Sequence, residues 1–277
     1  MSLYSASPST ASPAGADGAF DVRDFARTAR GSHRAELDLE TLGQASLGEE
    51  AVRLIRILRD LERATMQRMR NLLVTATHKD ARVTAFLTTW AYEKFWLADA
   101  LDAVLDATGH ERSAPDAEGP LRRSPAERAE RRGPVRRAIA GNLAGPQLVA
   151  AHVTTGLVDE WVMQAAFRRL GELASALESV AELAVEIKDR HIRFFAEEAS
   201  RRLGASRRAR QLARKEIARS AWPIGAVERP AADRSFFETV VFGSAPGRAA
   251  AERISELLAA LPGLTNVAPT VAARLVP

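Results

Sequence analysis

Four long segments of this chain repeat their apolar residues with the period of an α-helix, and each carries ionisable side chains along its apolar stripe. The segments cover residues 46–76, 81–107, 146–172 and 175–203. The ionisable residues are Glu62, Glu93, Glu160, and the pair Lys188 and His191. Apolar residues at this spacing predict helices that bury one face against one another. The stripes therefore predict a helical bundle with charged groups inside it.

The composition agrees with an all-α fold, because the helix-favouring residues Ala, Leu, Arg and Glu are abundant. The absence of cysteine excludes disulfides, thiolate ligands and iron–sulfur clusters. No apolar run approaches the roughly 18–20 residues that cross a bilayer, and no secretory signal is recognisable. We therefore expect a cytoplasmic protein without a transmembrane segment. The net charge of +4 does not by itself indicate binding to nucleic acid.

The sequence predicts three regions along the chain. Residues 1–45 are rich in Ser, Ala, Pro, Gly and Asp, and we expect a disordered arm because so few large apolar residues are available for burial. Residues 46–203 contain the four long helical patterns. Residues 204–277 predict a C-terminal helical extension that begins with a basic helix and becomes extended from Pro262.

The connection between the second and third long helices is itself long. It covers residues 108–145 and contains many Gly and Pro residues. Ser124 begins a capping pattern within it, which predicts a short Arg-rich helix. A connection of this length can cross from one end of a bundle to the other.

The two halves of the bundle repeat each other weakly. The separation in sequence between Glu62 and Glu93 is nearly the same as the separation between Glu160 and Lys188. The second member of each pair opens a partial Glu-x-x-His motif. Glu93 keeps the glutamate but is followed three residues later by Trp96, whereas His191 keeps the histidine but follows Lys188 by three residues.

This arrangement resembles the ferritin-like superfamily of non-haem di-iron carboxylate proteins, which includes ferritins, ribonucleotide reductase small subunits and acyl-carrier-protein desaturases. The resemblance covers about residues 47–203. It implies a ferritin-like four-helix bundle with a long crossover, in which two helices each supply a Glu and two each supply a Glu-x-x-His motif to two irons.

The resemblance also implies a role for each residue that matches the motif. Glu62 and Glu160 match the single glutamates, Glu93 matches the first motif's glutamate, and His191 matches the second motif's histidine. The two remaining ligand positions are occupied by Lys188 and Trp96.

These two departures change the chemistry expected of the site. Trp96 cannot ligate a metal, whereas the Lys188 ammonium can replace a metal's charge and keep buried glutamates ionised. We therefore predict that the di-iron site is lost or remodelled into a salt-bridge cluster of Lys188 with Glu62, Glu93 and Glu160, and that no cofactor is bound.

An alternative keeps metal chemistry at the same place. Iron or manganese held by the glutamates and His191 would make the chain an active non-haem oxidoreductase with a small-molecule substrate. Some ribonucleotide reductase small subunits also carry a lysine at a ligand position and work without metal. Tyr92 is a poor radical site here because it points off the apolar stripe.

A second alternative is a binding or scaffold protein. Residues 201–219 carry eight Arg and Lys residues against the single acid Glu216, with an apolar opposite face. Such a helix suits nucleic acid, anionic lipid or an acidic protein partner, although a solvated helix docked on the bundle explains the same pattern. By resemblance, a homodimer formed through the first two long helices is also expected.

Overall fold

The computed structural model describes residues 19–112 and 145–277, and this part of the chain contains helices and loops but no β-strand. The predicted all-α class is therefore confirmed for the described residues. Within these two ranges, none of the helices combines the length and apolar character that a membrane-spanning segment needs.

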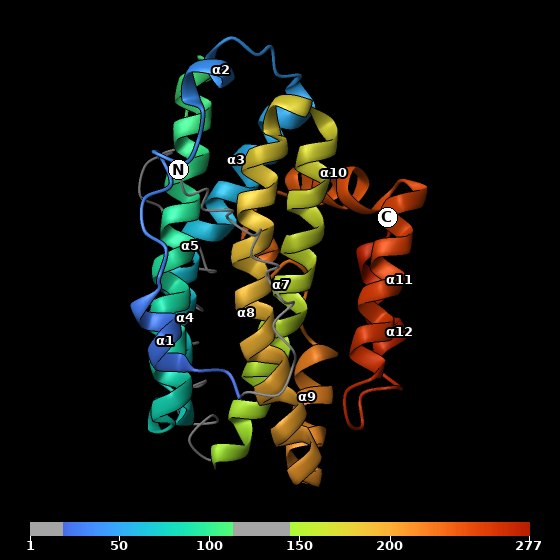
Figure 1. Ribbon diagram of the computed structural model, residues 1–277. Coiled ribbons are helices and arrows are strands. Elements are labelled where there is room, and N and C mark those ends of the chain that lie inside the picture. The colour runs from blue at the N-terminus through green and yellow to red at the C-terminus, as the bar shows by residue number, and fades with distance from the viewer. Residues whose placement is uncertain (1–18, 113–144) are drawn as a thin grey trace, which may run out of the picture.

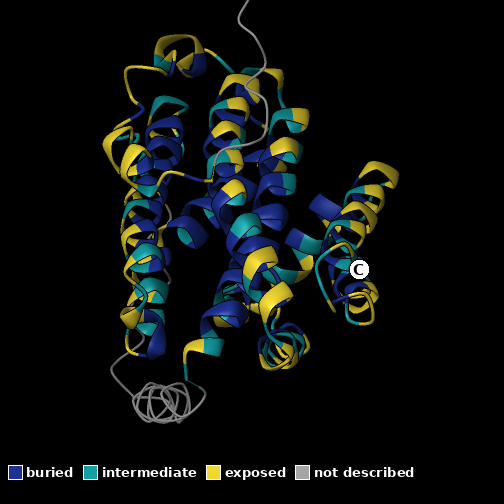
Figure 2. Cartoon of the chain, turned by 60° about the horizontal axis from the view of Figure 1, so that its bottom comes forward, coloured by how far each residue is buried: buried dark blue, intermediate teal, exposed yellow. Residues whose placement is uncertain are grey.

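The core is built by five helical elements that match the four predicted segments. They are α3 (Glu49–Arg63), α4 (Thr65–Leu73), α5 (Ala81–Ala107), α7 (Leu148–Leu173) and α8 (Glu178–Ala205). Helix α7 packs against α8 and α3 packs against α5, and α3 also touches α7, so the two pairs share one core. Figure 1 shows α5, α7 and α8 running alongside one another. Their facing sides carry the buried residues, coloured dark blue in Figure 2.

The boundaries of these helices follow the predicted periodicity with small differences. Residues 81–107 form α5 as predicted, and its first turn is capped by the Asp80 carboxylate, which accepts from the Val83 N–H at 3.0 Å. The predicted helix over residues 46–76 is divided at Ala64, whose N–H still donates to the Asp60 carbonyl at 3.0 Å. One-turn 3₁₀ helices, η2 (Gly145–Gln147) and η3 (Ser175–Leu177), precede α7 and α8, and another, η1 (Ala76–Lys79), precedes α5.

Residues 19–45 differ from the disordered arm that their composition suggested. They form two short helices, α1 (Val22–Arg27) and α2 (Leu39–Gly43), that lie against α5. Phe20 and Phe25 are buried, and the Phe25 ring stacks on Phe86 with a centroid distance of 5.1 Å. Few apolar residues are present, but the two aromatic rings insert into the core beside α1, and Leu37 and Leu42 are buried at α2, so both parts of the segment are anchored. The predicted disorder of residues 1–18 lies outside the described residues.

The long connection falls mostly outside the described residues. Helix α5 ends at Ala107, and the chain is described again from Gly145. The short Arg-rich helix expected after Ser124 therefore lies outside the described residues, as does most of the predicted crossover.

The C-terminal extension is helical and packs onto the core. Its elements are α9 (Arg207–Ile217), η4 (Ala226–Glu228), α10 (Ala231–Phe242), α11 (Ala245–Ala259) and α12 (Ala268–Leu275). Helices α9, α10 and α11 all contact α7, and α11 and α12 lie on the side of α7 away from α5 (Figure 1). The prediction of an extended end from Pro262 is wrong, because Val271 and Leu275 are buried at helical spacing and hold α12 in place.

Candidate functional site

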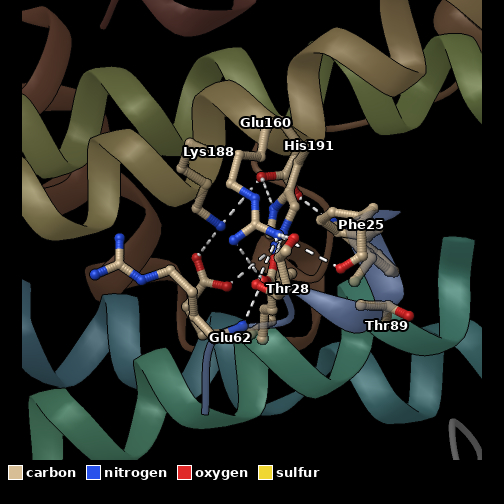
Figure 3. A network of polar contacts seen from close by, with 12 residues as sticks. Phe25, Thr28, Glu62, Thr89, Glu160, Lys188 and His191 are labelled. Carbon is tan, nitrogen blue, oxygen red and sulfur yellow. Dashed lines mark hydrogen bonds and ion pairs between the residues drawn. The ribbon is translucent and has the colours of Figure 1, made fainter. Parts of the chain in front are cut away.

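The ionisable residues on the four apolar stripes meet in the middle of the core. Glu62 comes from α3, Glu93 from α5, Glu160 from α7, and Lys188 and His191 from α8. Each of these side chains is 0% exposed. Figure 3 shows Lys188 and His191 reaching from α8 toward the other labelled residues of the cluster, Glu62 and Glu160. The helical periodicity thus brings together five of the six residues singled out in the sequence.

Two lysine ammonium groups lie between Glu62 and Glu160. Lys188 Nζ is 2.6 Å from Glu62 Oε1 and 3.1 Å from Glu160 Oε2. Lys94 Nζ is 3.2 Å from Glu62 Oε2 and 3.1 Å from Glu160 Oε1. Every oxygen of the two carboxylates therefore faces an ammonium nitrogen, and the four side chains form a closed ring of alternating charge.

Lys94 was not singled out from the sequence, although it leaves a signal there. It follows Trp90 by four residues and precedes Leu97 by three, and both of these lie on the apolar stripe of α5. Residues three or four apart share a helix face. The helical spacing therefore predicts that Lys94 faces the core, as it does for Glu93.

Trp96 is not part of the ring. Its indole lies against the rings of Tyr92 and Phe95, at centroid distances of 6.2 and 5.3 Å, and it is partly exposed. The expectation that Trp96 fills a ligand position in the core is wrong, because the rotation of α5 turns Lys94 inward instead.

Glu160 is the hub of the cluster. Besides the two ammonium groups, its Oε1 accepts from the Trp90 indole N–H at 2.7 Å, and its Oε2 lies 3.3 Å from His191 Nδ1. Burial alone would raise the pKa of Glu160, but the charges of Lys188 and Lys94 outweigh burial and hold this pKa well below its ordinary value. For Lys94 the directions are reversed. Burial acts to lower its pKa, but the charges of Glu160 and Glu62 outweigh burial, so the pKa of Lys94 is raised.

Glu93 connects the ring to the N-terminal segment. Its Oε2 is 2.8 Å from His191 Nε2, and its Oε1 accepts from the Arg30 backbone N–H at 2.8 Å and lies 3.1 Å from Arg190 Nη1. Burial acts to raise the pKa of Glu93, but His191, the Arg30 N–H and the Arg190 charge together lower this pKa further than burial raises it. Both ring nitrogens of His191 therefore face carboxylates, and both can donate only when the ring carries two protons.

Glu62 is held differently from Glu160. Neither of its oxygens accepts a hydrogen bond of good angular geometry, and Lys188 Nζ donates none, although the two groups are in close ionic contact. The Lys188 ammonium also lies 5.8 Å from the centre of the Phe167 ring. This part of the ring is held by charge rather than by directed hydrogen bonds, so its ions depend on each other for compensation.

The residues present do not fit a di-iron centre. Two metal ions would have to take the positions near the carboxylate oxygens where Lys94 and Lys188 now place their charges. The three carboxylates of the cluster already contact three fixed cations, Lys94, Lys188 and Arg190. In the described ranges, no group of three His, Asp or Glu side chains is arranged to hold a metal ion. The cluster therefore has no surplus negative charge to offer a cation.

Comparisons with known proteins do not identify the chain further. No family model matches it, and neither a search of curated proteins nor a search of solved structures finds a match.

Proposed function

We propose that this chain is a ferritin-like four-helix protein in which a lysine–glutamate ring takes the place of a di-iron centre, and that it works as a metal-independent binding protein rather than as an oxidoreductase. The positions of Glu62, Glu93, Glu160 and His191 on α3, α5, α7 and α8 support the ferritin-like comparison, because that design also draws its ligands from four inward-facing helix positions.

One observation carries the proposal. Lys94 and Lys188 come from different helices, yet both ammonium groups lie within 3.2 Å of Glu62 and Glu160. A buried carboxylate without a counter-charge is very unfavourable. Two ammonium groups supply positive charge at the place where metal ions would supply it, and they need no metal supply to do so. The ring then stabilises one packing of α3, α5, α7 and α8.

Metal analysis of the full chain tests this proposal. The protein is purified from cells grown with added iron and manganese, and its metal content is measured before and after reconstitution with Fe(II) in the absence of oxygen. We expect no stoichiometric metal. About two ions per chain would overturn the proposal and support the oxidoreductase alternative.

A single metal would have a different signature. About one ion per chain that is lost in His191→Ala would also overturn the proposal, in favour of a remodelled mononuclear site. The control is His110→Ala, because the His110 imidazole lies 3.0 Å from the nearby Thr108 hydroxyl and is outside the cluster.

A second candidate function is binding to a polyanion through α9. This helix buries Ala209, Ala213 and Ile217, and it leaves Arg207, Arg208 and Lys215 exposed, as is Arg219 in the following turn. The basic surface is narrower than the stretch 201–219, because Arg201 and Arg202 pair with Glu198 and Arg210 donates to the Leu203 carbonyl at 2.7 Å. Binding to DNA or anionic vesicles that is lost in Arg207→Ala/Arg208→Ala and weakened by salt would support this function. Absence of binding at low salt would remove it.

The homodimer and the cytoplasmic location stay predictions.

A further inference from the structure

A cavity of about 680 Å³ lies between α4, the first turns of α7 and α9. Its size falls within the roughly 300–1,000 Å³ range of small-molecule sites. The apolar part of its lining includes Leu61, Leu72, Leu148, Leu212 and Ile224. These side chains come from four helices and the loop that precedes η4, so the cavity is formed by the tertiary packing of the C-terminal extension on the core.

Helix α9 turns a basic face toward this cavity. Arg208, Leu212 and Lys215 line it at intervals of four and three residues, which places them on one helix face, and Arg219 joins them from the turn that follows the helix. None of the three cations forms an ion pair within residues 19–112 and 145–277, and the acidic lining residues there are Glu216 and Glu228. With Arg68, the lining has more cations than anions.

Arg68 presents a guanidinium group that is fixed in place at this cavity. Its Nη1 donates to the buried Asp159 carboxylate, whose other oxygen accepts the Ile224 N–H at 2.7 Å. Among the described residues, Nε and Nη2 of Arg68 make no hydrogen bond. A guanidinium held by one carboxylate with its remaining donors unused suits a second, planar or tetrahedral oxyanion.

His152 adds an uncharged polar group to the same lining. Its Nδ1 lies 2.8 Å from the Thr77 hydroxyl, and burial together with the charge of Arg68 lowers the pKa of the imidazole to about 4. The ring is therefore neutral near pH 7, and its other nitrogen can hydrogen-bond a ligand without adding charge.

We propose that this cavity binds a small organic anion with an apolar body, whose carboxylate or phosphate group is held by Arg68 and the basic face of α9. The apolar lining takes the body, and Arg208, Lys215 and Arg219, which pair with no acid in the described part of the chain, increase the local concentration of anions. This inference deepens the proposed binding function, but it is tested separately, because ligand titration measures the cavity and metal analysis measures the lysine–glutamate ring.

The test is calorimetric titration of the full chain with octanoate, octyl phosphate, 1-octanol and inorganic phosphate. The cavity variant is Arg208→Gln/Lys215→Gln, and the matched control is Arg207→Gln/Arg214→Gln, which removes the same charge from the same helix at positions that do not line the cavity. We expect one site per chain for the two anionic amphiphiles, weakened about tenfold or more in the cavity variant and changed less than about twofold in the control.

Each other outcome overturns a stated part of the proposal. Equal losses in the two variants would mean general attraction to a basic helix, and no binding of either amphiphile would remove the site. Equal binding of 1-octanol would overturn recognition of the anion, and equal binding of inorganic phosphate would overturn the role of the apolar lining. Leu212→Trp, which places an indole on the apolar lining without changing charge, should also weaken binding, and an unchanged affinity would place the ligand elsewhere.

Discussion

Lys188 Nζ lies 2.6 Å from Oε1 of Glu62, and both side chains are completely buried. The two residues belong to α8 and α3, which are distant in sequence, and their contact is ionic rather than a well-angled hydrogen bond. Each ion has one further counter-ion in the ring, Glu160 for Lys188 and Lys94 for Glu62, so loss of either member leaves the other with a single counter-charge. This makes the pair the most direct place to test whether charge, rather than metal, stabilises the core.

Replacing Lys188 by methionine should destabilise the protein by about 3–5 kcal/mol, because the change leaves Glu62 buried beside a single ammonium group. Methionine keeps much of the volume, so loss of charge dominates the effect. Urea unfolding followed by circular dichroism measures it. Lys79→Met, at an exposed lysine of η1 that lies outside both the cluster and the cavity, is the control and should change stability by no more than about 0.5 kcal/mol. An unchanged unfolding midpoint for Lys188→Met would contradict charge compensation.

Removing both members of the pair should cost less than removing either one. Replacing a buried ion pair by apolar residues of similar size is often close to neutral, whereas breaking it leaves one charge unpaired. We therefore expect Glu62→Leu/Lys188→Met to recover about 2 kcal/mol or more relative to Lys188→Met in a double-mutant cycle. If the loss of stability in the double variant equals the sum of the losses in Glu62→Leu and Lys188→Met, the two residues do not depend on each other.

Acid should destabilise the fold through Glu160 and Glu93. Folding lowers the pKa of each carboxyl below its ordinary value of 4.5, so the folded protein holds these protons less tightly than the unfolded chain does. Their contribution is therefore fully present above the unfolded pKa and is lost as the pH falls through the folded pKa. Urea midpoints should change little from pH 7 to about 5.5 and fall below about pH 4.5. Glu93→Gln should show a shallower fall, and an identical fall would exclude Glu93 from the effect.

Arg190 should control the order of the N-terminal segment. Its Nη2 donates to the Thr28 carbonyl at 3.1 Å, and its guanidinium lies 4.9 Å from the centre of the Phe25 ring. Arg190→Ala removes these contacts, so amide hydrogen exchange over residues 22–31 should become about tenfold faster or more, which corresponds to a loss of about 1.4 kcal/mol. Arg193→Ala, an exposed arginine one turn further along α8, is the control and should leave exchange there unchanged.

The sequence by itself determined the helices of the core and most of the charged residues within it. Apolar periodicity is a local property of the chain, and it predicted α5 over residues 81–107 and the inward direction of Glu62, Glu160 and His191 correctly. The helical extension after residue 204 was also visible in this way, although α12 was missed.

Only the tertiary structure decided which neighbouring residues on a stripe reach the centre and what covers it. Successive residues on a helix differ by about 100° in direction, so a modest rotation of α5 in its packed position admits Lys94 and excludes Trp96. The order of residues 19–45 also depends on long-range contacts, since Phe25 is buried against side chains such as Phe86 and Arg190. Such contacts join residues far apart in the chain, and no local pattern records them.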